Sequence, residues 1–311
     1  MILLEGIEFN NADPKMVTEY LSSISRKSIS FKPSNLKVSN DGKFLILQTL
    51  NGVVKEYPIR KSFLYKLLRW YSFPTNQLHR MSIDTVTSLC NDFLLNIRAD
   101  LVNVKLENDE ALTILSPGYN ELTDLEVLEL CSPFGIESIS RNDFFLRIYT
   151  NEKFKAEPIP GDLCGFSLNI FNSETGFGAL RVSHYLLRYQ CLNGAVVKVD
   201  ESNDKRFHYG HAEGELQKFL NSQIIKALES RLKLIHHIKK SNEEDLIPYV
   251  AKISKKIDRL LGKNSSQKFL KELKENSTLY DLFNVITSRA TDYDISKRLY
   301  LEKIAGELIS D

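Results

Sequence analysis

The chain has 311 residues, and its 41 lysine and arginine side chains are nearly balanced by 40 aspartate and glutamate side chains, for a formal net charge of +1. Hydrophobic residues make up 42% and charged residues 26%, values that exclude bulk disorder. No apolar run approaches the roughly 20 residues of a membrane helix, and the apolar start at 1–4 is too short for a signal-peptide core. We therefore expect a cytoplasmic protein of about two domains with no membrane partner.

Charge is distributed unevenly along the chain. Residues 99–137 hold nine acidic residues and one lysine, a balance of −8, whereas residues 205–274 hold sixteen basic and eight acidic residues, a balance of +8. Separated lobes of opposite sign can steer an anionic partner towards one surface. The alternative is that both segments are ordinary solvated faces.

The N-terminal part of the chain predicts little structure at first and then a hairpin. Residues 1–30 are polar and rich in serine, so we expect a weakly ordered lead-in. The Asp-Gly pair at 41–42 separates two apolar segments, 36–38 and 44–47, and predicts a hairpin because it supplies the positive φ angles of a tight turn. A further strand is expected over 53–57.

The middle of the chain predicts short helices first and then strands. Apolar spacing and a candidate N-cap serine predict, in chain order, helices over 63–71 and 82–97, strands over 101–106 and 111–115, an acidic helix over 123–130, and strands over 144–149, 166–171 and 179–189. A short helix near His184 is the alternative within the last of these strands.

After Gly210 the pattern becomes helical. Amphipathic periodicity predicts five helices, over 213–239, 243–261, 267–274, 278–290 and 295–309. Pro248 indicates that the second begins a few residues late, because proline is tolerated only in a first turn. Strands before helices predict an α+β fold, with a mainly antiparallel sheet and flanking helices in the first two-thirds and an all-helical C-terminal third. We expect a sheet domain over 31–210 and a helical domain over 211–311.

The most distinctive block joins two apolar strands through a turn made of Asn172, Ser173, Glu174, Thr175 and Gly176. Asparagine and serine side chains bond local backbone in such turns, and glycine allows the tight reversal. A second Asn-Gly signal follows at Asn193 and Gly194. The residues themselves predict two hairpin corners in a sheet.

This block resembles a phage- and plasmid-associated bacterial family described only as a domain of unknown function, through Asn-Ser-x-x-Gly at 172–176 and Arg-x-x-Cys-x-Asn-Gly at 188–194. The resemblance continues in the late helix, where Tyr280, Asn284 and Thr287 match the family's Tyr-x-x-x-Asn-x-x-Thr pattern. Leu192 stands where the family often carries a small polar residue. Members of the family lie in prophages, plasmids and other mobile elements, so the resemblance implies a genomic setting and no particular reaction.

Two arginines and one carboxylate of this block are candidates for a binding site. Arg188 lies in a strand that ends at the Asn-Gly corner, where it could offer a bidentate donor to a phosphate or carboxylate. Arg181 lies seven residues earlier, an odd spacing that places it on the opposite face of a regular strand. The alternative is a structural ion pair between Glu174 and one of these arginines.

On the late helix, the spacing of Tyr280, Asn284 and Thr287 places all three on one face. We expect this polar stripe to bond the motif turn and hold the two domains together. Lining a site is the alternative.

The candidate metal ligands do not form a convincing set. Four cysteines are spread along the chain without a Cys-x-x-Cys pair, at Cys90, Cys131, Cys164 and Cys191, which predicts reduced, buried thiols. His208 and His211 have the spacing His-x-x-His, which differs from that of helical zinc sites. We therefore predict no metal and no cofactor.

The leading hypothesis is a nucleic-acid-binding accessory protein of a mobile element, active in recombination or single-strand annealing, with single strands as the favoured partner. Aromatic side chains on a sheet can stack on unpaired bases while lysine and arginine hold phosphates. The aromatic candidates are Phe166, Phe171, Phe177, Tyr185 and Tyr189. The basic candidates are Arg181, Arg188, Lys233, Lys239, Lys240, Lys255, Lys256 and Arg259.

Two alternatives remain. An enzyme or small-ligand protein would use Arg188, Glu174 and Asn193 as a buried site. A partner-binding protein acting on host or phage machinery would use the acidic segment 99–137. The sequence contains no phosphate loop, Gly-x-Gly-x-x-Gly or Gly-x-Ser-x-Gly pattern, which favours a protein without catalytic activity. A homo-oligomer is left open.

Overall fold

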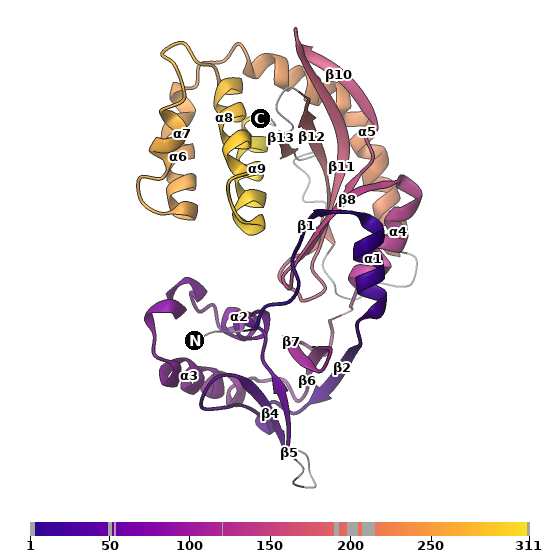
Figure 1. Ribbon diagram of the computed structural model, residues 1–311, viewed down its shortest axis with the longest axis vertical. Helices are drawn as coiled ribbons and strands as arrows, with labels where there is room; N and C mark the ends of the chain where they lie inside the picture. Colours follow the sequence, from indigo (N-terminus) through magenta and orange to yellow (C-terminus); the bar gives the residue numbers. More distant parts are fainter. Residues whose placement is uncertain are drawn as a thin grey trace.

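The computed structural model describes residues 4–48, 52, 54–119, 121–189, 193–197, 205–206 and 215–309. It confirms the α+β class, with antiparallel sheets and a helical C-terminal third. The elements form a crescent: an N-terminal lobe lies at one end, and a large sheet with the C-terminal helices forms the other (Figure 1).

The N-terminal lobe contains two three-stranded sheets and two helices. Its elements are β2 (Arg26–Phe31), β3 (Leu36–Val38), β4 (Phe44–Gln48), β5 (Val54–Pro58), α2 (Lys61–Trp70), α3 (Ile83–Leu95), β6 (Val102–Glu107) and β7 (Glu110–Leu115). Gly42 has a φ of 72° in the turn between β3 and β4, which confirms the predicted hairpin. Ser82 caps α3 by accepting from the backbone N–H of Thr85, as the sequence predicts.

The large sheet has eight strands, and all the pairings that define it are antiparallel. Its order is β1-β8-β9-β11-β12-β13, with β10 paired to β11 and β14 paired to β12. The strands are β1 (Phe9–Ala12), β8 (Ile136–Arg141), β9 (Leu146–Thr150), β10 (Phe154–Ile159), β11 (Asp162–Asn172), β12 (Leu180–Arg188), β13 (Asn193–Val197) and β14 (Lys205–Arg206).

One face of this sheet, which we call the covered face, is packed under helices. Successive side chains of a strand point to opposite faces, so the register of β11 with β12 places the pairs Phe166–Leu186 and Ile170–Val182 on this face. The helices that share its two hydrophobic cores are α1 (Pro14–Ser23), α4 (Asp124–Cys131), α5 (Glu215–Ser241), α6 (Ile247–Leu261), α7 (Ser266–Leu270), α8 (Leu279–Ala290) and α9 (Ile295–Leu308). Burial of both strand and helix residues fixes which face is covered.

The C-terminal helices begin and end close to where the sequence predicts. Pro248 lies in the first turn of α6, so this helix begins later than its periodicity alone indicates, as expected. Thr278 and Asp281 form a capping box at the start of α8. Phe166 of β11 belongs to the same buried hydrophobic core as Phe283 of α8 and Leu301 of α9, so these helices and the sheet share one core.

The prediction of a weakly ordered lead-in is wrong for residues 9–23, because they form β1 and α1. Val17 and Leu21 of α1 are buried in a core with residues of α4 and of the sheet, and β1 pairs with β8. These partners lie more than a hundred residues away, so local composition gives no sign of them. A second correction concerns Asn193 and Gly194, which belong to strand β13 rather than to a turn.

Three further expectations concern the helix near His184, the thiols and the membrane. His184 lies in the regular strand β12. Cys90, Cys131 and Cys164 are free and buried as predicted, whereas Cys191 lies outside the described residues. In the described part of the chain, no helix has both the length and the apolar character needed to cross a membrane.

Candidate nucleic-acid interface

The second face of the large sheet, which we call the open face, carries polar and aromatic side chains, and α9 packs against part of it, where Glu302 pairs with Arg147. In β11 and β12 the register places the pairs Ser167–Tyr185, Asn169–Ser183 and Phe171–Arg181 on this face. Tyr149 of β9 pairs with Asn169 and therefore lies on the same face. We call the open-face residues of β11 and β12, from Phe171 and Arg181 at one end to Tyr189 at the other, the aromatic track.

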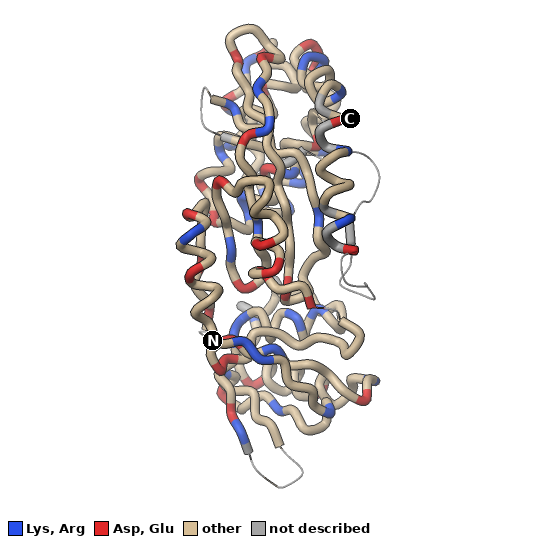
Figure 2. The backbone as a smooth tube through the Cα atoms, turned by 90° about the vertical axis from the view of Figure 1, so that its right-hand side faces the viewer, with Lys and Arg blue, Asp and Glu red and all other residues tan. Residues whose placement is uncertain are grey.

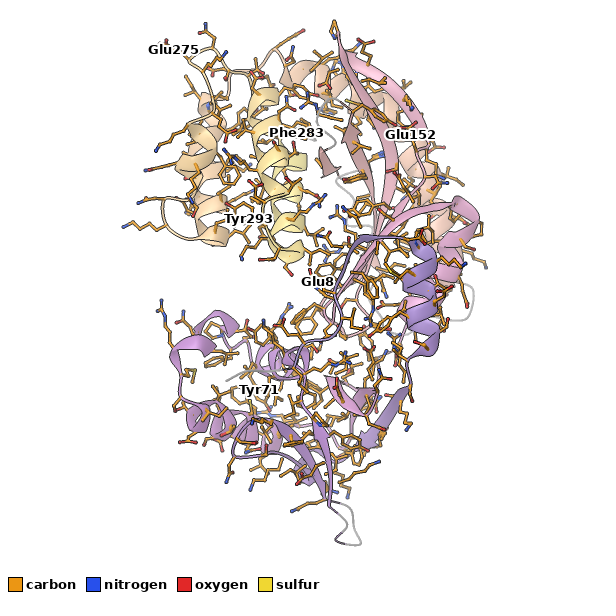
Figure 3. The ribbon with its side chains drawn as sticks, in the orientation of Figure 1. Glu8, Tyr71, Glu152, Glu275, Phe283 and Tyr293 are labelled. Carbon is orange, nitrogen blue, oxygen red and sulfur yellow. The ribbon has the colours of Figure 1, made fainter. Side chains whose placement is uncertain are left out.

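One end of the aromatic track is hollowed into a tyrosine pocket. The pocket has a volume of about 360 Å³ and is lined by Asn11, Glu137, Ser138, Tyr149, Glu152, Gly165, Ser167, Tyr185, Leu187, Tyr189 and Arg298. Glu152, labelled in Figure 3, accepts a hydrogen bond from the Tyr189 hydroxyl. A Cβ on Gly165 would lie 2.3 Å from Glu152 Oε2, so the Glu152 carboxylate lies close over the backbone of β11. Volumes of this size suit a small ligand or a single base.

A buried ion pair supports the rings of the pocket. Arg147 Nη2 donates to Glu302 of α9 over 2.6 Å, and its guanidinium lies 4.4 Å from the centroid of the Tyr149 ring. Tyr149 and Tyr185 meet edge to face, with centroids 4.4 Å apart. Burial raises the pKa of Tyr185 to about 12 and that of Tyr149 well above its usual range, so both hydroxyls stay protonated.

The opposite end of the track combines a ring with a cation. The Arg181 guanidinium lies 5.7 Å from the centroid of the half-buried Phe171 ring. Arg181 is exposed, and among the described residues no carboxylate pairs with it. Cation–ring contacts of this kind hold an arginine in place while its donors stay available.

The helix α2 adds two more cations near this end. Lys66 Nζ lies 5.5 Å and Arg69 Cζ 5.3 Å from the centroid of the Phe177 ring, in the turn that joins β11 to β12. Phe171 contacts this turn, since a Cβ on Gly178 would lie 2.7 Å from a Phe171 ring carbon. The predicted candidates did not include Tyr149, Lys66, Arg69 or Arg298, because only the sheet register and the docking of α2 bring them to the track.

The motif turn at 172–176 is confirmed as a hairpin corner. Its side chains stabilise the fold through hydrogen bonds to neighbouring segments. The Ser173 hydroxyl donates to the carbonyl of Phe144, and Asn172 Nδ2 donates to the carbonyl of Leu122. Gly176 has a φ of 77°, and its carbonyl accepts from Lys66 Nζ. The turn thereby docks onto the N-terminal lobe.

Glu174 belongs to a buried ion network between the N-terminal lobe and the sheet. Its members are Arg26, Arg60, Lys105, Glu107, Asp124, Arg141, Asp143 and Glu174. Burial alone would raise the pKa of Glu174, but Lys105, Arg26 and Arg141 outweigh it and lower this pKa to about 2. Burial and the charge of Glu174 raise the pKa of Asp124 to about 6.

The network changes the interpretation of the acidic segment. Glu107 and Asp124, two of its nine carboxylates, are buried and pair with Arg141. Glu110 pairs with Arg60, and Glu121 pairs with Lys105. Part of the segment's negative charge is thus neutralised internally, which weakens its use as a nucleic-acid mimic.

The structure does not bring Arg188 and Glu174 together. Arg188 lies on the covered face, where its Nε and Nη2 donate to Asp162 over 2.8 and 2.7 Å. The hydroxyl of Tyr280 donates to the same carboxylate over 2.5 Å, so α8 is tied to the start of β11 rather than to the motif turn. Arg188 is therefore a structural residue. Arg181 and Arg188 lie on opposite faces, as the spacing predicts.

The remaining motif residues also have structural positions. The Thr287 hydroxyl donates to the backbone carbonyl of Asn284 within α8. Asn193 pairs with Arg188 along the backbone. Gly194 faces the Tyr185 ring, because a Cβ there would lie 2.3 Å from the ring.

The predicted basic residues of the C-terminal third are divided between two helices. Lys233, Lys239 and Lys240 are on α5, and Lys255, Lys256 and Arg259 are on α6. Figure 1 shows α5 along the sheet and α6 beyond α8 and α9, so the two sets do not lie side by side. Lysine and arginine are scattered along the length of the chain in Figure 2. Lys240 pairs with Glu244 and Lys256 with Glu307.

A second pocket, of about 430 Å³, lies where the two lobes meet, near Glu8 in Figure 3. Its lining includes the carboxylates of Glu5, Glu8, Asp143 and Asp294. Burial and the charges of Asp294 and Glu5 raise the pKa of Glu8. Carboxylates repel phosphate, so this pocket does not suit nucleic acid.

The structure gives no metal centre in the residues that it describes, since no group of three or more suitable ligands is found among them. His208 and His211 lie outside the described residues.

Comparison of the chain with protein-family models, with curated proteins and with solved structures found no match. The motif resemblance therefore stays a prediction.

Proposed function

We propose that this protein binds single-stranded nucleic acid along the aromatic track. The observation that carries the proposal is the strand alternation, which puts the half-exposed rings of Phe171 and Tyr189 on the same side of the hairpin as Arg181. Rings stack on bases of any sequence, and nearby cations hold the phosphates. Phe166, which the sequence grouped with these rings, lies on the covered face and takes no part.

A single strand fits this surface better than a duplex. Stacking on side chains requires unpaired bases, and the half-exposed rings of Phe171 and Tyr189 lie at opposite ends of the track. The eight residue steps from Arg181 to Tyr189 span about 26 Å at the usual rise of a strand. This length suits a short segment of single-stranded nucleic acid. An accessory role in a mobile element rests on the motif resemblance alone.

The test is a titration of labelled single- and double-stranded oligonucleotides at two salt concentrations. Single strands are expected to bind more tightly, with affinity falling as salt rises because phosphate contacts release counterions. Phe171→Leu keeps the apolar volume but removes the ring, and it is expected to weaken binding about tenfold. Tyr300→Ala is the matched control, because Tyr300 is 50% exposed on α9 and does not line the tyrosine pocket.

Two results would contradict the proposal. One is an absence of binding to single strands at low salt. The other is an affinity that Phe171→Leu and Tyr300→Ala change equally, because the ring of the track would then have no special part in binding.

A small-ligand function is the second candidate, and the volume of the tyrosine pocket, about 360 Å³, together with its polar lining favours it. Its polar groups differ from those that the sequence suggested: Arg298, Glu152 and Ser167 take the place of Arg188, Glu174 and Asn193. Mononucleosides that bind as tightly as an oligonucleotide would support this function over strand binding.

A further inference from the structure

Two cations of α2 meet across one aromatic ring of the motif turn. Lys66 and Arg69 are three residues apart, so they project from the same side of the helix. Both lie within 6 Å of the centroid of the Phe177 ring, as given above. One Lys66 donor is used by the carbonyl of Gly176 over 2.5 Å, which leaves two of its three donors for another acceptor.

The charges of these two residues have no counterion among the described residues. Arg60, Arg141, Arg147 and Arg188 are all buried, and each pairs with one or more carboxylates. No ion pair is found for Lys66 or Arg69 within the ranges that the structure describes. Burial, followed by the neighbouring charge of Arg69, lowers the pKa of Lys66 to about 8. An anion between the two side chains would relieve this repulsion.

The surroundings of the pair are fixed by the docked turn. Thr113 Oγ1 donates to the carbonyl of Thr175, and the Tyr119 hydroxyl donates to the carbonyl of Ser173. A Cβ on Gly176 would lie 2.6 Å from Lys66 Nζ, and its φ of 77° also favours glycine. The lysine head group is therefore held in place before any ligand binds, which lowers the entropic cost of binding.

We infer that Lys66 and Arg69, above the Phe177 ring, form a binding site for a phosphate group. Two adjacent cations match the charge of a phosphomonoester, which carries close to two negative charges at neutral pH. The site lies at the Phe171 end of the aromatic track, where the motif turn docks onto the N-terminal lobe. If a strand occupies the track, the group that fits the site is its terminal phosphate; this part rests on the proposed function.

The site itself is tested with inorganic phosphate, without any nucleic acid. The lysine side-chain signals of the full chain are followed by NMR during a phosphate titration. We expect saturable binding and a rise in the pKa of Lys66 by about one unit or more, because a bound anion favours the charged form. Arg69→Gln should weaken phosphate binding about tenfold, and Arg69 is exposed, so the fold should be unaffected.

Lys61→Gln is the matched control, because Lys61 is on the same helix but pairs with Glu5. It should leave phosphate binding unchanged. The inference is overturned if the Lys66 signals show no saturable response to phosphate, or if Arg69→Gln and Lys61→Gln have the same effect.

A second set of titrations identifies the source of the phosphate. Oligonucleotides of one sequence are compared with a phosphate at the 5′ end, at the 3′ end or at neither end. Tighter binding of one phosphorylated form, lost in Arg69→Gln, supports recognition of a strand end. Equal affinities combined with saturable binding of inorganic phosphate overturn the strand-end assignment and support a small phosphoester. Phosphate binding without any binding of single strands contradicts the proposed function and leaves the phosphate site supported.

Discussion

The buried and the exposed arginines of the large sheet differ in how their charges are compensated. On the covered face, Arg188 is buried and pairs with Asp162, and Arg141 pairs with Asp124. On the open face, Arg147 is also buried and pairs with Glu302, whereas Arg181 is exposed and lies over an aromatic ring with no carboxylate partner among the described residues. The difference teaches that charge compensation, rather than residue type, separates structural arginines from candidate ligand-binding ones.

The comparison predicts that the largest loss of stability follows a substitution on the covered face. Arg141→Ala would leave Asp124 and Glu107 without one of their cations inside the ion network. Removing one partner of a buried ion pair costs about 3–5 kcal/mol in the free energy of unfolding, because an uncompensated charge remains buried. Urea unfolding measures this loss. Lys27→Ala is the control, since its pair with Asp109 is exposed, and it should change stability by less than about 1 kcal/mol. Equal effects of the two substitutions would contradict the role of the network.

The pH dependence of the free energy of unfolding tests the burial of His184 on the covered face. Burial lowers the pKa of His184 to about 4, and its Nε2 lies 2.9 Å from Ser230 Oγ of α5. Below about pH 6.5, His184 takes up a proton in the unfolded chain but stays neutral in the folded protein until the pH approaches 4. The free energy of unfolding therefore falls as the pH is lowered from about 6.5 towards 4. Between pH 7.5 and pH 5, the wild type should therefore lose about 2 kcal/mol more than His184→Gln. Parallel pH profiles of the two proteins in urea unfolding would show that His184 is not buried in its neutral form.

A smaller effect is expected where α8 meets the sheet. Tyr280→Phe removes the hydrogen bond to Asp162 but leaves the Arg188 pair in place. We expect a loss of about 1.5 kcal/mol in the free energy of unfolding. Tyr300→Phe on the exposed side of α9 should have no measurable effect. A wild-type stability for Tyr280→Phe would break the proposed tie between helix and sheet.

The smallest stability effect is expected on the open face. Arg181→Gln should change the free energy of unfolding by less than about 0.5 kcal/mol, because the side chain is exposed. It should nevertheless weaken single-strand binding severalfold and reduce the salt slope by about one phosphate contact. Lys15→Gln on α1 is a control of the same charge change, since Lys15 is exposed away from the track. An unchanged salt slope for Arg181→Gln would remove this arginine from the interface.

The sequence predicts most of the local structure because hairpin turns, helix caps and apolar periods act over a few residues. The Asp-Gly at 41–42, Ser82 and Pro248 each mark the turn or helix start that the structure shows. The opposite faces of Arg181 and Arg188 follow from strand period alone.

The site depends on contacts between distant segments, which local patterns do not reveal. Glu174 meets Arg26 across 148 residues, and Arg147 meets Glu302 across 155. The basic run at 205–274 drew attention to α5 and α6, whereas Lys66 and Arg69 come from a helix with an ordinary composition. The sequence predicts that Phe166 and Tyr185 are both aromatic residues of strands. Only the pairing of β11 with β12 shows that they lie on different faces of the sheet.

Photo-crosslinking of a single-stranded oligonucleotide, followed by mass spectrometry of the linked peptides, tests the central claim most directly. Crosslinks at Phe171 or Tyr189 are the predicted result, because their half-exposed rings lie on the open face of the β11–β12 hairpin. Crosslinks confined to the lysines of α5 and α6 would contradict the account and return the interface to the basic helices.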